Sequence, residues 1–142
     1  MAAKVGFDSV NVGDEVFSAS KVVKAGDVKA YADASGDQNP LHQDDAFAQS
    51  VGYPGRIGHG MYSMAHLTKA LGEWVGDPAA IKSVKVQFRA VVYMDETLVA
   101  KGRIASKDEG TRQVTVELWE ELERDGEVQN PIKNATAVVE LA

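Results

Sequence analysis

The stretch that decides the fold is His59-Gly-Met-Tyr-Ser-Met-Ala-His-Leu-Thr-Lys-Ala-Leu-Gly-Glu-Trp74, which leaves few polar positions over sixteen residues. A pattern this apolar predicts a helix that is surrounded by protein rather than half-exposed at the surface. Gly72 and then Gly76-Asp-Pro78 supply the stop signals that end it. The chain should therefore contain one long central helix that another layer covers.

The sequence after this helix changes its period from helical to twofold. Apolar and polar residues alternate there, as in half-buried strands. Turn signals stand at Asp108–Gly110 and at Asp125-Gly126. The inward-facing sets are Val84, Val86, Phe88 and Ala90; Leu98, Ala100, Gly102 and Ile104; Val114, Val116 and Leu118; and Ala135, Ala137, Val139 and Leu141. Four strands joined by hairpin-like turns predict an antiparallel sheet whose one apolar face covers the helix, an α+β fold.

The sequence before the helix is mixed. A strand should run to about Val23, and a helix is expected over residues 27–34 with Gly36 as its stop. A second, short helix is expected over residues 44–49, and residues 51–55 have turn chemistry. The expected order is thus one strand, the helices, and four strands. Gly102 has two interpretations, a close approach of helix to sheet or a β-bulge.

Composition limits the classes of protein that fit. The 142 residues, 44% of them hydrophobic, suit one domain covering residues 1–142. The absence of cysteine excludes disulfides and thiolate catalysis, and the net charge of −6 disfavours nucleic acid as a partner. The first eight residues lack the apolar run of a signal peptide, and no segment approaches the roughly 20 apolar residues that span a bilayer. A cytoplasmic location is the default expectation.

Candidate chemistry gathers in Tyr31-Ala-Asp-Ala-Ser-Gly-Asp-Gln-Asn-Pro-Leu-His42 and in Gly58-His-Gly-Met61. Pro40 forces the preceding residue out of the α region, so Asp37 and His42 lie on a turn that can direct both side chains at one water. Alone, Asp37 would be an ordinary turn residue and His42 an ordinary loop residue. Together they favour an acid–base pair, and the Gly60 N–H at a helix start suits a developing negative charge.

Gly36-Asp-Gln-Asn-Pro-Leu-His42 followed by His59-Gly-Met61 resembles the signature of the MaoC-like, (R)-specific enoyl-CoA hydratases, which have the hot-dog fold. Val12-Gly-Asp14 and Val86-Gln-Phe-Arg-Ala90 extend the resemblance. It implies that Asp37 and His42 hold a water and share the acid–base work of adding it to a trans-2-enoyl thioester. It also implies that the Gly60 N–H binds the thioester carbonyl, and that the protein forms at least a homodimer.

Further residues are candidates for substrate binding, each beside a structural interpretation. Asn39 and Pro40 shape the turn, and His59 would hold the helix start through a backbone hydrogen bond. Arg56 could meet a phosphate of coenzyme A or of a carrier protein, and Met61 could line the acyl tunnel or pack in the core. His66 and Thr68 favour structural roles. The three histidines show no metal-ligand spacing, so neither metal nor redox cofactor is expected.

The sequence also has two notable surface features, and it is compatible with three alternative functions. A basic stripe of Lys85, Arg89, Lys101 and Arg103 could serve a carrier, although Glu117 predicts ordinary cross-strand pairs. The segment after Phe88 has no Gly-Asp turn, so a longer loop is expected there. The alternatives are the catalytic subunit of a heterodimeric hydroxyacyl-carrier-protein dehydratase, an acyl-CoA thioesterase, and a non-catalytic acyl-thioester-binding module.

Overall fold

The computed structural model describes residues 5–142. Of the first eight residues, in which no signal peptide is expected, residues 1–4 lie outside the described part. The elements are, in chain order, η1 (Phe7–Ser9), β1 (Glu15–Val22), α1 (Ala25–Ser35), η2 (Pro40–His42), α2 (Asp45–Ser50), α3 (Gly60–Val75), η3 (Pro78–Ala80), β2 (Ile81–Phe88), β3 (Thr97–Asp108), β4 (Gln113–Arg124), β5 (Glu127–Gln129) and β6 (Ile132–Glu140). Within residues 5–142, no helix combines the length and the apolar character needed to cross a bilayer.

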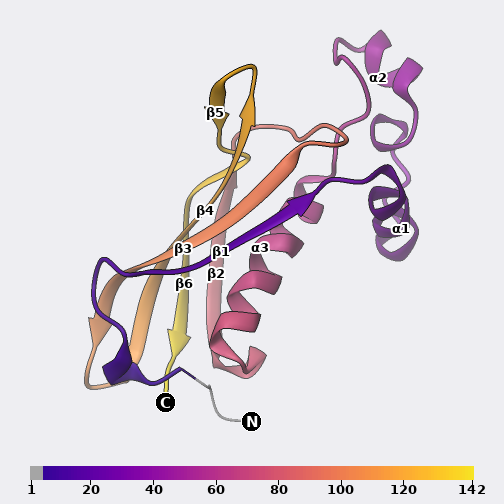
Figure 1. The fold of residues 1–142 in the computed structure, drawn as a ribbon. Helices are drawn as coiled ribbons and strands as arrows, with labels where there is room; N and C mark the ends of the chain where they lie inside the picture. Colours follow the sequence, from indigo (N-terminus) through magenta and orange to yellow (C-terminus); the bar gives the residue numbers. More distant parts are fainter. Residues whose placement is uncertain (1–4) are drawn as a thin grey trace.

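The strands form one antiparallel sheet in the order β1-β3-β4-β6-β2, and the short β5 pairs with β4. α3 lies along one face of this sheet, while α1 and α2 gather near the N-terminal end of α3 (Figure 1). The α+β class, with one helix against an antiparallel sheet, is confirmed. The main core forms where Leu67, Leu71 and Val75 of α3 meet inward residues of the strands, such as Ile104 and Leu118.

The helix α3 is covered on one side only, which corrects the expectation that protein surrounds it. Leu67 and Leu71 are fully buried, but Met61 is 54% exposed and Ala65 also faces outward. The apolar pattern is wider than the face that the sheet covers. This outward side of α3 is therefore available to a ligand or to another chain.

The sheet departs from the prediction in its connections and at its edges. β2 and β3 do not form a hairpin, because β2 is an edge strand beside β6 while β3 lies between β1 and β4. The loop that joins them is long, as expected, and contains Asp95 at φ 68°. At the edge, Phe88 is 50% exposed rather than inward-facing, and the sheet has a fifth strand after the long helix, β5, that the pattern did not reveal.

The possible basic stripe does not form within the described part of the chain, because this strand order separates its members. Lys85 lies on the edge strand β2, and β4 and β6 separate it from the lysine and arginine of β3. On β3, Lys101 pairs with Glu121 at 2.9 Å and Arg103 pairs with Glu117 at 3.6 Å. The outward charges are thus ordinary cross-strand pairs.

β4 carries an inward acid that the sequence prediction omitted. The alternation does not stop at Leu118 but continues through Glu120 and Leu122, both of which are buried. Neither carboxylate oxygen of Glu120 has a hydrogen-bond partner within residues 5–142. Burial raises the pKa of this carboxyl to about 9.

Gly102 permits a close approach, but between two strands and not between helix and sheet. It lies opposite Phe17 of β1, next to an irregularity in the register at Glu15. A Cβ at this position would lie 2.6 Å from one Phe17 ring carbon and 3.2 Å from Val116 Cγ1. The ring of Phe17 then reaches Trp74 of α3, with ring centroids 6.4 Å apart.

We therefore expect Gly102→Ala to lower the free energy of unfolding by about 1–3 kcal/mol, because the added methyl overpacks the Phe17 ring. Urea unfolding of the purified variant measures this. Gly72→Ala is the matched control: nothing lies within 4 Å of a Cβ there, so the same change inside a helix should be stabilising. Equal effects at the two glycines would contradict the proposed clash, and Phe17→Leu should reduce the cost of Gly102→Ala.

Candidate active site

The Asp37 side chain is held by the turn that ends α1. Gly36 adopts the left-handed conformation at φ 80° and donates its N–H to Ala32 O. One carboxylate oxygen, Asp37 Oδ1, accepts the backbone N–H of Asn39 at 3.2 Å. Asn39 in turn caps η2 by accepting the Leu41 N–H at 3.0 Å. The turn thus fixes the carboxyl while more than half of its surface, 53%, stays exposed.

One hydrogen bond of His42 determines which of its ring nitrogens carries the proton. Its Nδ1 lies 2.7 Å from Ile57 O, a group that can only accept, so Nδ1 carries the proton in this arrangement. Ile57 is itself anchored, because its N–H donates to Leu41 O at 3.1 Å. Nε2 of the neutral imidazole is then the nitrogen with a free lone pair, as a general base requires.

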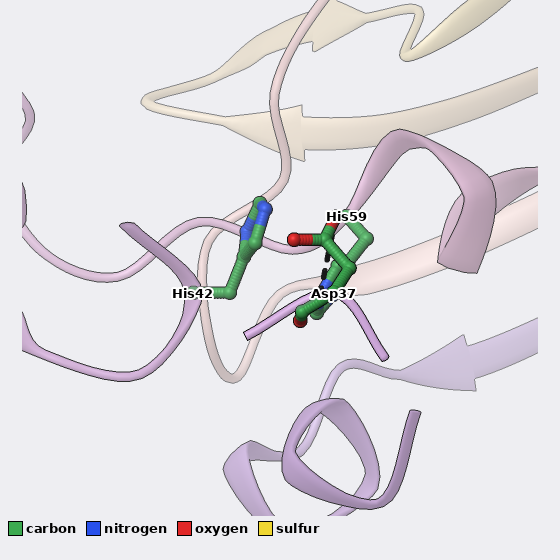
Figure 2. Close-up of side chains that lie close together, drawn as sticks. All are labelled: Asp37, His42 and His59. Carbon is green, nitrogen blue, oxygen red and sulfur yellow. Dashed lines mark hydrogen bonds and ion pairs between the residues drawn. The ribbon is translucent and has the colours of Figure 1, made fainter. Parts of the chain in front are cut away.

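His59 contacts both Asp37 and His42. It is the N-cap residue of α3, is only 2% exposed, and lies with Nε2 at 3.1 Å from the backbone carbonyl of Asp37. Its ring stacks on His42 with centroids 3.7 Å apart, and Tyr31 contacts it edge-on at 4.9 Å. Figure 2 shows the three side chains of Asp37, His42 and His59 side by side.

Gly60 begins α3 beside this cluster. The first N–H groups of a helix have no acceptor within the helix, so a ligand can accept from them. A Cβ on Gly60 would lie 3.3 Å from the ring of Phe88, so glycine leaves the approach open. The resulting pocket has a volume of about 280 Å³, and its lining residues are Tyr31, Ser35, Asp37, His42, His59, Gly60, Met61 and Phe88.

The fold also brings together a possible set of metal ligands, which corrects the expectation drawn from histidine spacing. One ligand atom each of Asp37, His42 and His59 lies within 4.8 Å of the others. However, one nitrogen of each imidazole is already bound to a backbone carbonyl. The same separation lets a single water hydrogen-bond to both Asp37 and His42, since each such bond spans about 2.8 Å. The geometry serves a held water without requiring a metal ion.

The remaining candidates are divided between the pocket and its surroundings. Met61 lines the pocket, whereas Asn39 and Pro40 shape the loop without lining it. Arg56 is engaged elsewhere, because both its backbone N–H and its Nε donate to Asp45 Oδ1, at 2.9 and 3.0 Å. The backbone hydrogen bond first, and the guanidinium with it, holds the pKa of Asp45 below its usual range.

Three lining residues were not singled out from the sequence. Tyr31 and Ser35 come from α1, and Phe88 comes from the end of β2. Tyr31 falls at a helical position next to the Asp37 turn, which is a signal that could have identified it. Phe88 is brought to Gly60 by the tertiary fold alone.

His66 and Thr68 lie further along α3 and have local hydrogen bonds. His66 Nε2 lies 2.9 Å from Ala19 O, and burial lowers the pKa of its imidazole. Thr68 donates its hydroxyl to Met64 O at 3.0 Å. Both contacts are structural, as the sequence favoured.

Comparison with known proteins gives a consistent result over most of the chain. The model of the family described as "MaoC like domain" matches residues 8–124. A 3-hydroxybutyryl-CoA dehydratase of Methylorubrum extorquens is 29% identical over 127 residues, which cover 85% of this chain and 80% of that protein. The peroxisomal enoyl-CoA hydratase 2 of Arabidopsis thaliana is 41% identical over 69 residues, 47% of this chain, but the match spans only 22% of that longer protein.

Among solved structures, an (R)-hydratase from A. caviae involved in PHA biosynthesis superposes with a TM-score of 0.83. It is 25% identical, and the match covers 94% of this chain and 98% of that one. The agreement therefore extends over nearly the whole fold.

Proposed function

The chain belongs to the MaoC-like dehydratase family and has its hot-dog fold, and from that premise we propose that it catalyses the reversible addition of water to trans-2-enoyl thioesters. The product would be the (R)-3-hydroxyacyl thioester, by analogy with the (R)-hydratase that it resembles. The observation that carries the proposal is the grouping of Asp37, His42 and the Gly60 N–H around one pocket.

In the proposed mechanism, Asp37 and His42 hold a water between a carboxylate oxygen and Nε2. As the water oxygen bonds to C3 of the substrate, the pair removes its proton. Electrons move through the double bond to the thioester oxygen, where the Gly60 N–H would stabilise the enolate charge. Proton delivery to C2 completes the hydration. The reverse sequence is dehydration, so one site serves both directions, and the protons are assigned to the Asp37–His42 pair as a unit.

The carrier, the assembly and the location are proposals of the same kind. A CoA thioester and an acyl-carrier-protein thioester share the reacting group, so either fits this site. The edge strand β2 has no partner on its outer side within the described residues, and pairing with a second copy there would cover the exposed Phe88. We propose a homodimer of single-domain chains acting in the cytoplasm, with the heterodimeric dehydratase as the alternative assembly.

The direct test is the loss of conjugated-enoyl absorbance when the purified full chain meets trans-2-butenoyl-CoA, read together with free thiol. We expect hydration without thiol release, and no loss of rate after incubation with EDTA, because the proposed steps need no metal ion. Thiol release would identify a thioesterase instead. Loss of activity in EDTA that Zn²⁺ restores would assign the three-residue cluster to a metal, and no turnover of CoA or carrier-protein thioesters would refute the hydratase proposal.

A further inference from the structure

A bidentate ion pair fastens the loop between β2 and β3, residues 89–96, to the end of β4. Arg124 donates from Nε and Nη2 to the two carboxylate oxygens of Glu96, at 2.8 and 2.6 Å, and from Nη2 to Val91 O at 3.1 Å. Its guanidinium also lies 4.3 Å from the centre of the Tyr93 ring. The side chains of Arg124 and Glu96 are only 24% and 14% exposed. Such a pair holds its partners in one geometry, which single contacts between exposed charges do not.

Glu96 also holds the backbone of Tyr93, because its Oε1 accepts the Tyr93 N–H at 2.6 Å. Tyr93 forms an antiparallel bridge with Ile57, and the neighbouring Gly58 donates its N–H to Val92 O at 2.8 Å. The two segments lie in close contact, since a Cβ on Gly58 would be 2.5 Å from Val92 Cγ2. The position of Ile57 therefore depends on the position of the loop.

Ile57 carries the carbonyl that binds the imidazole of His42. Its oxygen lies 2.7 Å from His42 Nδ1, and this bond selects the tautomer that has the proton on Nδ1 and a free lone pair on Nε2. An imidazole without such a bond exchanges between both tautomers. In the other tautomer Nε2 is protonated and cannot take a proton from water. The contacts that run from Arg124 through Glu96 and Tyr93 thus end at the nitrogen pair on which the proposed mechanism depends.

We propose that Arg124 and Glu96 are positioning residues for His42: together they fix the backbone carbonyl that binds its Nδ1, and so keep the proton on that nitrogen. The inference rests on the proposed hydratase function, in which this tautomer accepts a proton from water. Neither Arg124 nor Glu96 lines the catalytic pocket, so both act through the loop and not on the substrate. A role in stability alone would leave the tautomer of the folded protein unchanged.

The direct test is the tautomer of His42 in the purified full chain, measured from the ¹⁵N chemical shifts of labelled histidine at alkaline pH. In the wild type we expect the proton on Nδ1. Arg124→Met removes the donors but keeps an apolar stem, and should convert this single tautomer into a mixture of both. Glu96→Gln keeps the size of the side chain, weakens the pair and should act in the same direction, also if Arg124→Met fails to fold. A wild type with the proton on Nε2, or folded variants with wild-type signals, would overturn the inference.

Arg103→Met is the matched control for Arg124→Met. Arg103 also pairs with a glutamate, Glu117, at 3.6 Å, and its guanidinium lies 4.9 Å from the centre of the Trp119 ring. These residues belong to β3 and β4 and not to the loop, so the His42 signals should stay as in the wild type. Gly102→Ala, which should destabilise the fold, controls for a general loss of stability and should leave the signals unaltered as well.

The kinetic test uses the hydration of trans-2-butenoyl-CoA. Arg124→Met and Glu96→Gln should lower kcat by about tenfold to 10²-fold, the effect of a small misplacement of a reacting group. KM should stay within about twofold of wild type, because neither side chain meets the substrate. Arg124→Lys keeps a charged donor, so it should lose less kcat and retain more of the Nδ1–H tautomer than Arg124→Met.

A shift of the His42 tautomer without a loss of kcat would overturn the positioning role while the hydratase proposal stands. A loss of kcat with an unchanged tautomer would also overturn it, since Arg124 and Glu96 would then act by another route. An absence of hydratase activity would refute the proposed function alone, because the ¹⁵N comparison of Arg124→Met with Arg103→Met still supports or refutes the link to His42.

Discussion

Asp37→Asn should lower kcat/KM for the hydration of trans-2-enoyl-CoA by about 10²–10⁴-fold, the range that a positioned general acid–base group contributes. The substitution keeps the shape of the turn, because the Asn side-chain oxygen can still accept the Asn39 N–H that Asp37 Oδ1 accepts now. What it removes is the negative charge and the basic oxygen beside the water. His42→Gln should cause a loss of similar size, since the amide has no basic nitrogen to replace Nε2.

Asp33→Asn is the matched control for this experiment. Asp33 lies one turn earlier at the end of α1, is exposed, and pairs with Lys29 at 2.8 Å. Asp33 is absent from the lining of the pocket, so kcat/KM of the Asp33→Asn variant should stay within about twofold of wild type. The double variant of Asp37 and His42 should lose little more than either single variant, because the two act as a unit. Full activity in Asp37→Asn would remove this residue from the mechanism.

Glu120→Gln should make the protein more stable at neutral pH, with an advantage that depends on pH. The folded-state pKa is raised to about 9 by burial, against 4.5 for the ordinary carboxyl. Below pH 4.5 the group is protonated in both the folded and the unfolded chain. Above it, only the unfolded chain loses the proton, so stability falls by about 1.4 kcal/mol per pH unit until the folded-state pKa is reached. The cost amounts to about 3 kcal/mol at pH 7.

Glutamine has the size of the protonated acid but cannot ionise. The free energy of unfolding of Glu120→Gln should therefore not fall with pH as that of the wild type does. Urea unfolding at pH 5, 6, 7 and 8 would show the two curves meeting near pH 4.5 and separating as pH rises. Glu123→Gln is the control on the same strand, where the side chain is exposed. Its free energy of unfolding should change with pH in the same way as that of the wild type. Parallel curves for Glu120→Gln would show that the carboxyl gains a partner or a solvent path in solution.

The sequence was sufficient to predict the elements in which apolar and polar residues alternate strictly. The inward sets of β3, β4 and β6 are buried as predicted, because a twofold pattern determines the face of each residue once one face is covered. Glu120 occupies the next inward position after Leu118, but a charged side chain interrupts the apolar pattern there. Strand order was beyond the sequence, since turns that look alike can join neighbouring strands or cross the sheet.

The candidate site was predictable to the extent that it is local. Asp37 and His42 are five residues apart, and Gly36, Asn39 and Pro40 each determine part of the turn between them. The stacking of His59 on His42, the tether to Ile57 O and the position of Phe88 all depend on contacts across the fold. Arg56 was a candidate because it is a cation near the site motif, and its pairing with Asp45 could not be predicted from the sequence.

The strand order also determines when during folding the site can form. β3 and β4 are joined by a tight turn, so their pairing closes only a short loop, whereas β1 pairs with β3 between partners such as Phe17 and Gly102. Closing that longer loop costs more chain entropy, and non-local pairing slows folding. The segment that carries Asp37, His42 and Gly60 lies between β1 and β2, the two outermost strands of the sheet. Catalytic competence is thus tied to contacts of large sequence separation, and a kinetic intermediate built on β3 and β4 alone would be inactive.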